Sequence, residues 1–566
     1  MKVQLSGNSL IRLALVSMIG LAISLNSGVP AQAAIEDILL EKGVITKEVW
    51  VAIKAEKEQE IKAAKEKDAA TQTNASPVAS SPSPATPTAA PASPSNEGAS
   101  LKVVEREKEP TTGELISGSG FQKIRYKDVY LAPGGFAEGT TIWRSQNQNA
   151  DVGSTYGNIP LSGSTNSKMS EFRGSARQSR LSLLAETQPT GVQKLSGYVE
   201  GDFLGVGVTS NEQESNSWAP RLRQFWATVD FDSKSSLTVG QAWSLLTTHR
   251  QGLMPRSEYI PYTIDAQYVV GYNWTRQFQV RVAQDFGNGV WAAFSIENPE
   301  TIAPNVTAPA VGAINSGVVL PANVQGFAGS SNTANPSSTL NGGSVSTDVA
   351  PDLVSKLVVE PGWGHWELKA LGRFFRDRLN GGNHNAFGGG VGAAAILPVH
   401  NTLNFIVEGL SGAGIGRYAS SVGTDVIAKT DGTVVPIRAT QLMTGLEWKP
   451  TAAWDWYAYY GYEYYDRAAY AGTNVGYGSS LNNLSGCSSD FPAGVCQAAN
   501  KTVWQLHPGF WYRFFQGRTG IAAVGLDYSF THRQLWEGLN GAPGKSVLNP
   551  NGRENILMAS FRYYLP

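Results

Sequence analysis

Polar and apolar side chains alternate along short segments through most of the chain. In the clearest segment, 454–466, the even-numbered positions hold only Trp, Ala and Tyr as far as residue 464, whereas the odd-numbered positions include Asp455 and Glu463. A period of two is typical of a β-strand whose two faces meet different media. We therefore expect one face to contact an apolar medium and the other to contact water.

Sixteen such segments follow one another. We predict strands at 130–145, 176–187, 194–204, 221–232, 235–245, 273–286, 289–297, 352–360, 364–377, 387–397, 401–410, 437–449, 454–465, 503–515, 518–532 and 553–564. The connectors after even-numbered strands are short, whereas those after odd-numbered strands are long, with extremes at 298–351, 411–436 and 466–502. A meander that crosses a membrane gives this alternation, because tight turns gather at one rim and long loops at the other.

The pattern predicts an all-β fold, a 16-stranded antiparallel transmembrane β-barrel. In lipid every backbone amide needs a partner, so strands persist only in a closed barrel. A β-sandwich also alternates, but its connectors would not sort into two length classes. Tryptophans near the predicted strand ends are typical of an interfacial aromatic girdle. These are Trp143, Trp243, Trp274, Trp291, Trp363, Trp366, Trp448, Trp454, Trp456, Trp504 and Trp511.

Composition agrees with a membrane barrel. The 566 residues are 16% charged, below the roughly 25% of soluble domains, yet only 42% hydrophobic. All-β barrels often exceed the usual domain size as one unit. The formal net charge of −1 argues against a nucleic-acid-binding protein, so any ionic preference must come from local placement of charge.

The first 115 residues divide into three predicted segments. Residues 1–33 have a basic start, an apolar run and a small-residue cleavage signature, and we interpret them as a secretory signal peptide. The alternative, a membrane anchor, needs about 20 apolar residues, and this run is shorter. Residues 34–70 predict a periplasmic helical segment, either a small oligomerisation element or a solitary solvated helix. Residues 71–115 are rich in Pro, Ala and Ser, which predicts an extended linker, and the barrel follows at 116–566.

Cys487 and Cys496 are the two cysteines of the chain, and they lie in a polar, Gly-rich segment. In an exported protein this spacing favours a disulfide that pins a loop. The alternative is a pair of free thiols.

Four stretches carry a family resemblance. SARQSRLSLLAETQ (175–188), GYVEGDFLG (197–205), RLRQFWATVDF (221–231) and LTVGQAWSLL (237–246) resemble the trimeric porins of Gram-negative bacteria that are similar to the DcaP channels. The resemblance implies an outer-membrane homotrimer of 16-stranded barrels, an N-terminal periplasmic segment and narrow pores that favour small anionic solutes such as dicarboxylates. One departure is the C-terminus, which reads FRYYLP, whereas outer-membrane barrels usually end in an aromatic residue.

Fixed charge on the wall of a pore selects solutes, and Arg or Lys lowers the barrier to anions. Strand parity places Arg180 and Arg281 on the lumen side, and it is ambiguous for Arg221 and Arg223 because Phe225 shares their parity. These arginines either select anions or pair with carboxylates of neighbouring strands and brace the wall. The candidate pore-lining residues are Arg177, Arg180, Arg221, Arg223, Arg281, Glu200 and Asp202.

The connector 246–272 is the candidate constriction. In sixteen-stranded porins the third long loop folds into the barrel, and the resemblance assigns that place to this segment. Opposed basic and acidic groups across a pore would orient dipolar solutes. The alternative is an ordinary surface loop. Its candidate residues are His249, Arg250, Arg256, Glu258 and Asp265.

Enzyme motifs are not found. The six histidines show no metal-binding spacing, and no GxSxG motif occurs, so we expect neither catalysis nor a cofactor or metal. We expect an outer-membrane channel for passive diffusion of small hydrophilic, anionic solutes, in contact with outer-membrane lipid. One alternative is a sugar-selective channel, in which Tyr457 and Tyr459 would stack on sugar rings. A second is a secreted β-rich carbohydrate-binding protein or adhesin.

Overall fold

The computed structural model of the chain describes residues 102–104, 123–148, 150–205, 219–302, 318–319, 324–325, 348–379, 381–470, 474–488, 496–497, 499–539, 546–547 and 550–565. All of them belong to one compact unit, Glu97–Pro566. The predicted signal peptide, the predicted helical segment and residues 71–101 of the predicted linker lie outside the described residues.

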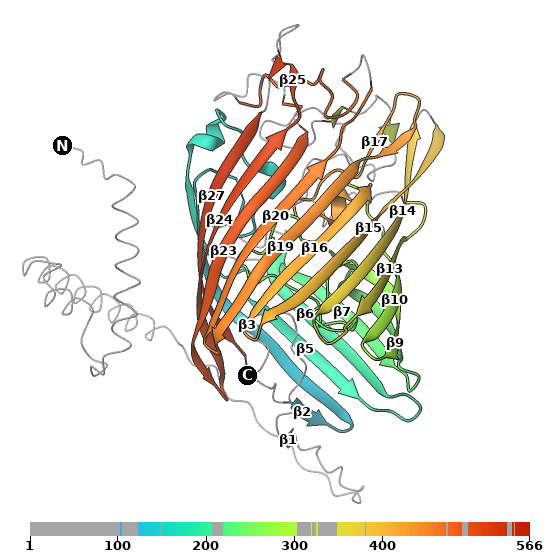
Figure 1. Cartoon of the computed structure of the whole chain (residues 1–566), viewed down its shortest axis with the longest axis vertical. Coiled ribbons are helices and arrows are strands. Elements are labelled where there is room, and N and C mark those ends of the chain that lie inside the picture. Colours follow the sequence, from blue (N-terminus) through green and yellow to red (C-terminus); the bar gives the residue numbers. More distant parts are fainter. Residues whose placement is uncertain are drawn as a thin grey trace, which may run out of the picture. The chain divides into compact units, whose positions relative to one another are not determined.

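Sixteen antiparallel strands form a closed barrel, and they run obliquely side by side in Figure 1. The last strand pairs with the first, so the sheet of the barrel has no free edge. The strands are β3 (Val129–Arg144), β5 (Arg180–Thr187), β6 (Lys194–Gly205), β7 (Ala219–Asp230), β8 (Ser235–Trp243), β9 (Arg276–Gly287), β10 (Val290–Glu297), β13 (Asp352–Val359), β14 (His365–Leu379), β15 (Gly382–His400), β16 (Leu403–Ala413), β19 (Arg438–Thr451), β20 (Trp454–Tyr465), β23 (Asn500–Gly517), β24 (Gly520–Leu535) and β27 (Asn551–Tyr564). All sixteen predicted strands and the predicted closed barrel are confirmed.

Shorter elements accompany the barrel strands. β4 (Glu171–Ser175) precedes β5 in the chain and is separated from it by a break at 176–179. It pairs with the C-terminal part of β3, Thr140–Arg144. Within the predicted linker, β1 (Lys102–Val104) pairs with β2 (Lys123–Tyr126), which pairs with β3. The remaining elements are β11 (Val318–Val319), β12 (Val324–Gln325), β17 (Val426–Ala428), β18 (Val434–Pro436), β21 (Ala468–Ala469), β22 (Gly476–Tyr477), β25 (Gly538–Leu539), β26 (Ser546–Val547) and the 3-10 helices η1 (Tyr156–Asn158), η2 (Thr165–Lys168) and η4 (Gly416–Tyr418). Within the described ranges, no helix is long and apolar enough to cross a membrane.

The alternation of side chains along the strands decides what each face contacts. On β20, Trp456 is 40% exposed and Tyr460 is 37% exposed on the outside of the barrel, whereas Asp455 and Glu463 are fully buried inside. The outer face is therefore apolar and aromatic, and the inner face carries the charges. The two faces predicted from the period of two are confirmed.

Four tryptophans are not where the sequence placed them: Trp243, Trp274, Trp291 and Trp511. Trp274 is in a connector inside the barrel, and Trp291 packs against buried interior residues. Trp243 and Trp511 are almost fully buried and face the inside of the barrel rather than the interfacial girdle. Their positions near strand ends gave the girdle assignment, but they share parity with inward neighbours. The Trp511 indole donates to the carbonyl of Tyr262 (2.8 Å), so an interior polar partner satisfies its N–H.

The connections between strands sort by length with one exception. The turn after β9 is Asn288-Gly289, and both residues have positive φ (54° and 74°), as a two-residue hairpin turn that matches the strand twist requires. The prediction that every connection after an odd-numbered strand is long is wrong for the ninth strand. β14 and β15 extend toward each other, and only residues 380–381 separate them.

Candidate functional site

The connector between β8 and β9, residues 244–275, lies inside the barrel; we call it the inward loop. Side chains such as Tyr259, Ile264 and Tyr272 are fully buried. Its backbone amides donate to inward carboxylates from five strands of the wall, β10, β14, β16, β20 and β24. The bonds are Leu245 to Glu297 (2.8 Å), His249 to Glu367 (2.7 Å), Ile264 to Asp527 (2.7 Å), Gly271 to Glu463 (2.9 Å) and Asn273 to Glu408 (3.0 Å).

These bonds explain how an irregular segment can occupy the interior. Buried backbone N–H groups must find acceptors, and a segment without regular structure leaves most of them unpaired by its own carbonyls. Carboxylates are strong acceptors because their charge strengthens the bond. The carboxylates of the wall strands therefore act as the hydrogen-bond acceptors that backbone carbonyls provide within a helix.

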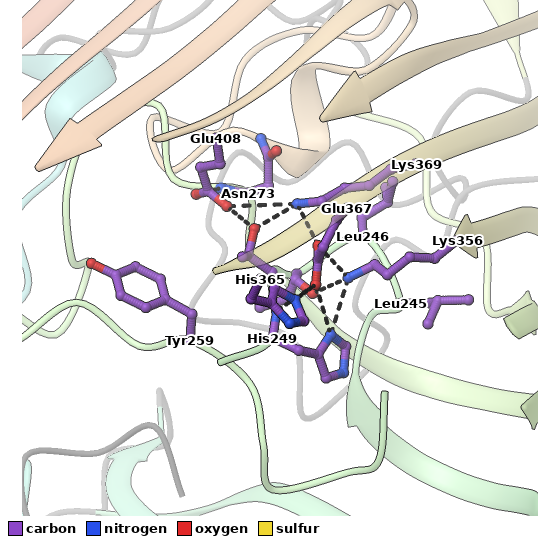
Figure 2. Close-up of polar contacts among 12 residues, drawn as sticks. Leu245, Leu246, His249, Tyr259, Asn273, Lys356, His365, Glu367, Lys369 and Glu408 are labelled. Carbon is purple, nitrogen blue, oxygen red and sulfur yellow. Dashed lines mark hydrogen bonds and ion pairs between the residues drawn. The ribbon is translucent and has the colours of Figure 1, made fainter. Parts of the chain in front are cut away.

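A buried ionic cluster holds the start of the inward loop, and Figure 2 shows its members converging on Glu367. Lys356 of β13 lies 2.8 Å from the Glu367 carboxylate and donates to the carbonyl of Thr247 (2.7 Å). Lys369 of β14 donates to the hydroxyl of Thr248 (2.6 Å), and that hydroxyl donates to Glu408. Two wall lysines thus bind two successive residues of the loop.

His249 belongs to the same cluster. Its Nδ1 lies 3.0 Å from the ammonium of Lys356. Burial, and after it the charge of Lys356, lowers the pKa of His249 well below its ordinary value. The imidazole is therefore neutral and accepts a hydrogen bond from Lys356.

A second connector, residues 414–437 between β16 and β19, also lies inside the barrel and packs on the inward loop. The hydroxyl of Ser420 donates to the carbonyl of Val269 (2.6 Å), and the indole of Trp274 donates to the carbonyl of Ala419 (3.0 Å). Arg373 on the wall holds this connector through Asp425 (2.8 Å). The inward loop is therefore fixed from both the wall and a neighbouring loop.

Three of the predicted arginines, on β5 and β7, are paired with acids of the adjacent strand β6. Arg223 lies 2.6 Å from Glu200 and 3.1 Å from Asp202, and Arg221 lies 2.7 Å from Asp202. Arg180 lies 3.6 Å from Glu200. Five of the predicted pore-lining residues thus form one network on β5, β6 and β7, and these contacts brace the wall.

A β-bulge explains why parity was ambiguous on β7. The register with β6 shifts so that Glu200 faces Gln224 whereas Gly201 faces Leu222, which leaves Arg223 as an extra residue. Leu222 and Phe225 point outward (49% and 63% exposed), and the residues between them point inward. Both Arg221 and Arg223 therefore face the lumen.

A narrow hollow lies between this wall and the inward loop. Its charged and polar lining residues include Arg180, Arg223 and Arg562 from the wall and Asp265 and Tyr268 from the loop. Burial alone would raise the pKa of Tyr268, but the surrounding arginines, Arg223 foremost, lower it. A phenol whose pKa falls despite burial reports a positive potential in the hollow.

The other candidate residues lie away from the hollow. Arg177 pairs with Asp151 (2.6 Å), and Arg281 donates to the carbonyl of Trp243 (2.6 Å). In the inward loop, Arg250 pairs with Glu447 (3.0 Å), and Arg256 lies over the ring of Tyr198 at 5.2 Å. Glu258 forms a β-bridge with His249, and burial raises the pKa of its carboxyl group.

Asp265 is the loop residue of the predicted set that lines the hollow. Its Oδ1 accepts hydrogen bonds from the amides of Gln267 (2.8 Å) and Ser154 (3.1 Å). It therefore shapes the loop as well as contributing negative charge opposite the wall arginines.

Among the residues of the hollow that sequence reasoning missed are Phe136, Tyr268 and Arg562. Arg562 shares the polar parity of β27 with Ser560, which was a usable signal. Phe136 shares parity with Glu138 and Thr140 on β3, which was a usable signal as well. Tyr268 carried none, because parity does not apply to an irregular loop.

Tyr457 and Tyr459 face the lumen but are covered by the inward loop. Their hydroxyls donate to Asp527 (3.2 Å) and Glu447 (2.8 Å), and both side chains are at least 96% buried. They are not open to a sugar ring in this structure, which removes the support for the sugar-channel alternative.

The sulfurs of Cys487 and Cys496 are joined as a disulfide within the connector that follows β20. Among the described residues, no group of three or more His, Cys, Asp or Glu side chains is arranged to hold a metal ion.

The outer-membrane channel DcaP of Acinetobacter baumannii is similar in fold, with a TM-score of 0.54 and 17% identity over 78% of this chain and 99% of that chain. The anion-selective porin from Comamonas acidovorans (TM-score 0.43, 10% identity, 77% and 100%) and OprB of Pseudomonas putida (TM-score 0.41, 10% identity, 76% and 94%) also match. The chain matches no protein-family profile and no curated protein sequence. It has the sixteen-stranded fold of outer-membrane porins, in agreement with its resemblance to DcaP-like porins.

Proposed function

We propose that the protein is a passive diffusion channel of the bacterial outer membrane that favours small hydrophilic anions, dicarboxylates among them. The observation that carries the proposal is geometric: guanidinium groups from three strands of the wall, β5, β7 and β27, converge on the hollow. Arg180, Arg223 and Arg562 line the hollow together with Asp202 and Asp265, so cations outnumber carboxylates there. Arginines on a pore wall lower the electrostatic barrier to anions.

The outside of the barrel supports a membrane location. Phe278, Val280 and Val282 follow one another on the outer face of β9, and Phe278 and Val282 are more than half exposed. Such a continuous apolar face suits acyl chains, and a secreted soluble sugar-binding protein would not present it. Long connectors at one rim favour an extracellular orientation of that rim. The chain enters β3 at the opposite rim, which agrees with a periplasmic N-terminal segment.

The reversal potential of the purified protein in a planar bilayer, measured across a potassium chloride gradient, tests the proposal. We expect a sign that corresponds to chloride preference, and a dicarboxylate that lowers the chloride current. Cation preference would refute the anionic selectivity. A trimer, proposed from the resemblance, should run as a heat-modifiable species on a denaturing gel.

A further inference from the structure

The ring of Phe136 on β3 is in contact with cationic and aromatic side chains of the two neighbouring strands, β5 and β27. On β3 it faces the lumen and is 5% exposed. The strand registers place it opposite Arg180 of β5 on one side and opposite Tyr564 of β27 on the other. Side chains that are directly opposite on one face of a sheet have Cβ atoms about 4.5–5.5 Å apart. The register alone therefore puts a guanidinium group and a phenol against this ring.

The contacts of the ring follow from this placement. The Cζ atom of Arg180 lies 5.1 Å from the centre of the Phe136 ring, and that of Arg562 lies 4.7 Å from it. Arg562 also lies 4.4 Å from the ring of Trp511, and the rings of Phe136 and Tyr564 are 5.4 Å apart. The negative face of an aromatic ring attracts a guanidinium group at these distances. Two arginines of the hollow thus share one aromatic platform.

Each arginine also has a carboxylate partner, which fixes one edge of its guanidinium group. Arg180 lies 3.6 Å from Glu200, and Arg562 lies 3.0 Å from Glu138. An ion pair of this kind fixes distance, whereas contact with a ring fixes the plane of the guanidinium group. Without the ring, each arginine could turn further onto its carboxylate and reduce the positive potential in the hollow.

We propose that Phe136 is a positioning residue that determines specificity. Its ring holds Arg180 and Arg562 at a fixed separation with their guanidinium groups toward the hollow, so that both act on one passing anion. The proposal rests on the anion preference proposed above. Phe136 carries no charge, so its replacement leaves every ionisable group in place. Any change in selectivity would therefore come from the positions of the arginines and not from a loss of charge.

The experiment compares Phe136→Leu and Phe136→Tyr in planar bilayers, with reversal potential and single-channel conductance measured on the same channels. Leucine keeps an apolar side chain without a π face, and tyrosine keeps the ring. We expect the anion-to-cation permeability ratio of Phe136→Leu to fall by about fourfold, since two guanidinium–ring contacts are lost and each is worth a factor of roughly two, while conductance changes little. Phe136→Tyr should retain the wild-type ratio.

Phe278→Leu is the matched control, because it makes the same substitution at a phenylalanine on the outer face that is 54% exposed. Heat modifiability on a gel verifies folding of every variant, and Phe136→Met replaces Phe136→Leu if the latter fails to fold. If the wild-type channel prefers anions and Phe136→Leu keeps the same ratio, the positioning role is wrong and the proposed function stands. If the wild-type channel shows no anion preference, both are refuted.

Discussion

Glu463 joins the two loops that fill the barrel, and its removal is the sharpest test of how they are held. Its carboxylate accepts hydrogen bonds from the amides of Gly271 (2.9 Å) and Ser421 (3.3 Å), one in each loop. It also accepts the hydroxyls of Ser420 (3.1 Å), Ser421 and Tyr465 (2.8 Å). The side chain is fully buried, so water does not replace these bonds while the loops stay in place.

The magnitude follows from the donors that Glu463→Ala would leave without an acceptor. A buried donor without a partner costs about 1–3 kcal/mol, so the two backbone amides alone disfavour the docked loops by about 2–6 kcal/mol. Because every 1.4 kcal/mol is a factor of ten, the undocked population rises roughly 30-fold or more. We expect a larger and noisier single-channel conductance.

Single-channel recording, together with uptake of a solute too large for the wild-type pore, measures this effect. Asp285→Ala is the matched control, because Asp285 accepts from the amide of Gly287 in a short turn (2.6 Å). Glu463→Gln keeps one acceptor oxygen and should fall between the wild type and Glu463→Ala. A folded Glu463→Ala channel with wild-type conductance and noise would refute the anchoring role of this carboxylate.

Three further predictions follow from other parts of the barrel. Arg223→Gln removes a cation of the hollow and should lower the anion-to-cation permeability ratio by about threefold or more; an unchanged reversal potential would contradict the proposed selectivity. Leu446→Arg places a charge on the outer face, where Leu446 is 45% exposed, and should cost about 2 kcal/mol or more in urea titrations of vesicle-inserted protein. His249 is neutral beside Lys356 because burial lowers its pKa; the undocked loop has the ordinary pKa near 6.5, so lowering the pH below about 6.5 protonates the undocked form and should increase channel noise. His249→Gln should abolish that pH dependence, whereas His400→Gln should keep it.

The strands were predictable because the two faces of each one meet media of opposite polarity. β20 begins and ends at the predicted residues, since Trp454 and Tyr465 bound a segment in which an outer face of Trp, Ala and Tyr alternates with an inner face that carries Asp455 and Glu463. The alternation of polar and apolar residues does not predict how far a strand continues beyond the membrane. β14 and β15 continue to a two-residue connection at 380–381, where neither face has to be apolar.

The site was predictable only in part, for two physical reasons. The bulge at Arg223 adds one residue to β7, and a parity count cannot detect an inserted residue. The inward loop could be located from the resemblance, but its path is set by hydrogen bonds from backbone amides to distant carboxylates such as Asp527 and Glu463. Backbone amides look alike in every sequence, so residue types carried no signal of those partners.

The carboxylates that hold the inward loop bind mainly its main chain, although Glu408 also accepts the hydroxyl of Thr248. A variant with other side chains between Leu245 and Asn273 would follow the same path, provided that Gly271, which has a positive φ and no room for a Cβ atom, is kept. The carboxylates of Glu297, Glu367, Glu408, Glu463 and Asp527 must also stay in place. The wall carboxylates that hold the loop in place are therefore different residues from the loop side chains that contact permeating solutes. Substitutions in the loop alone would therefore change which solutes pass through the channel. A transplanted loop of equal length should bind to the same wall carboxylates.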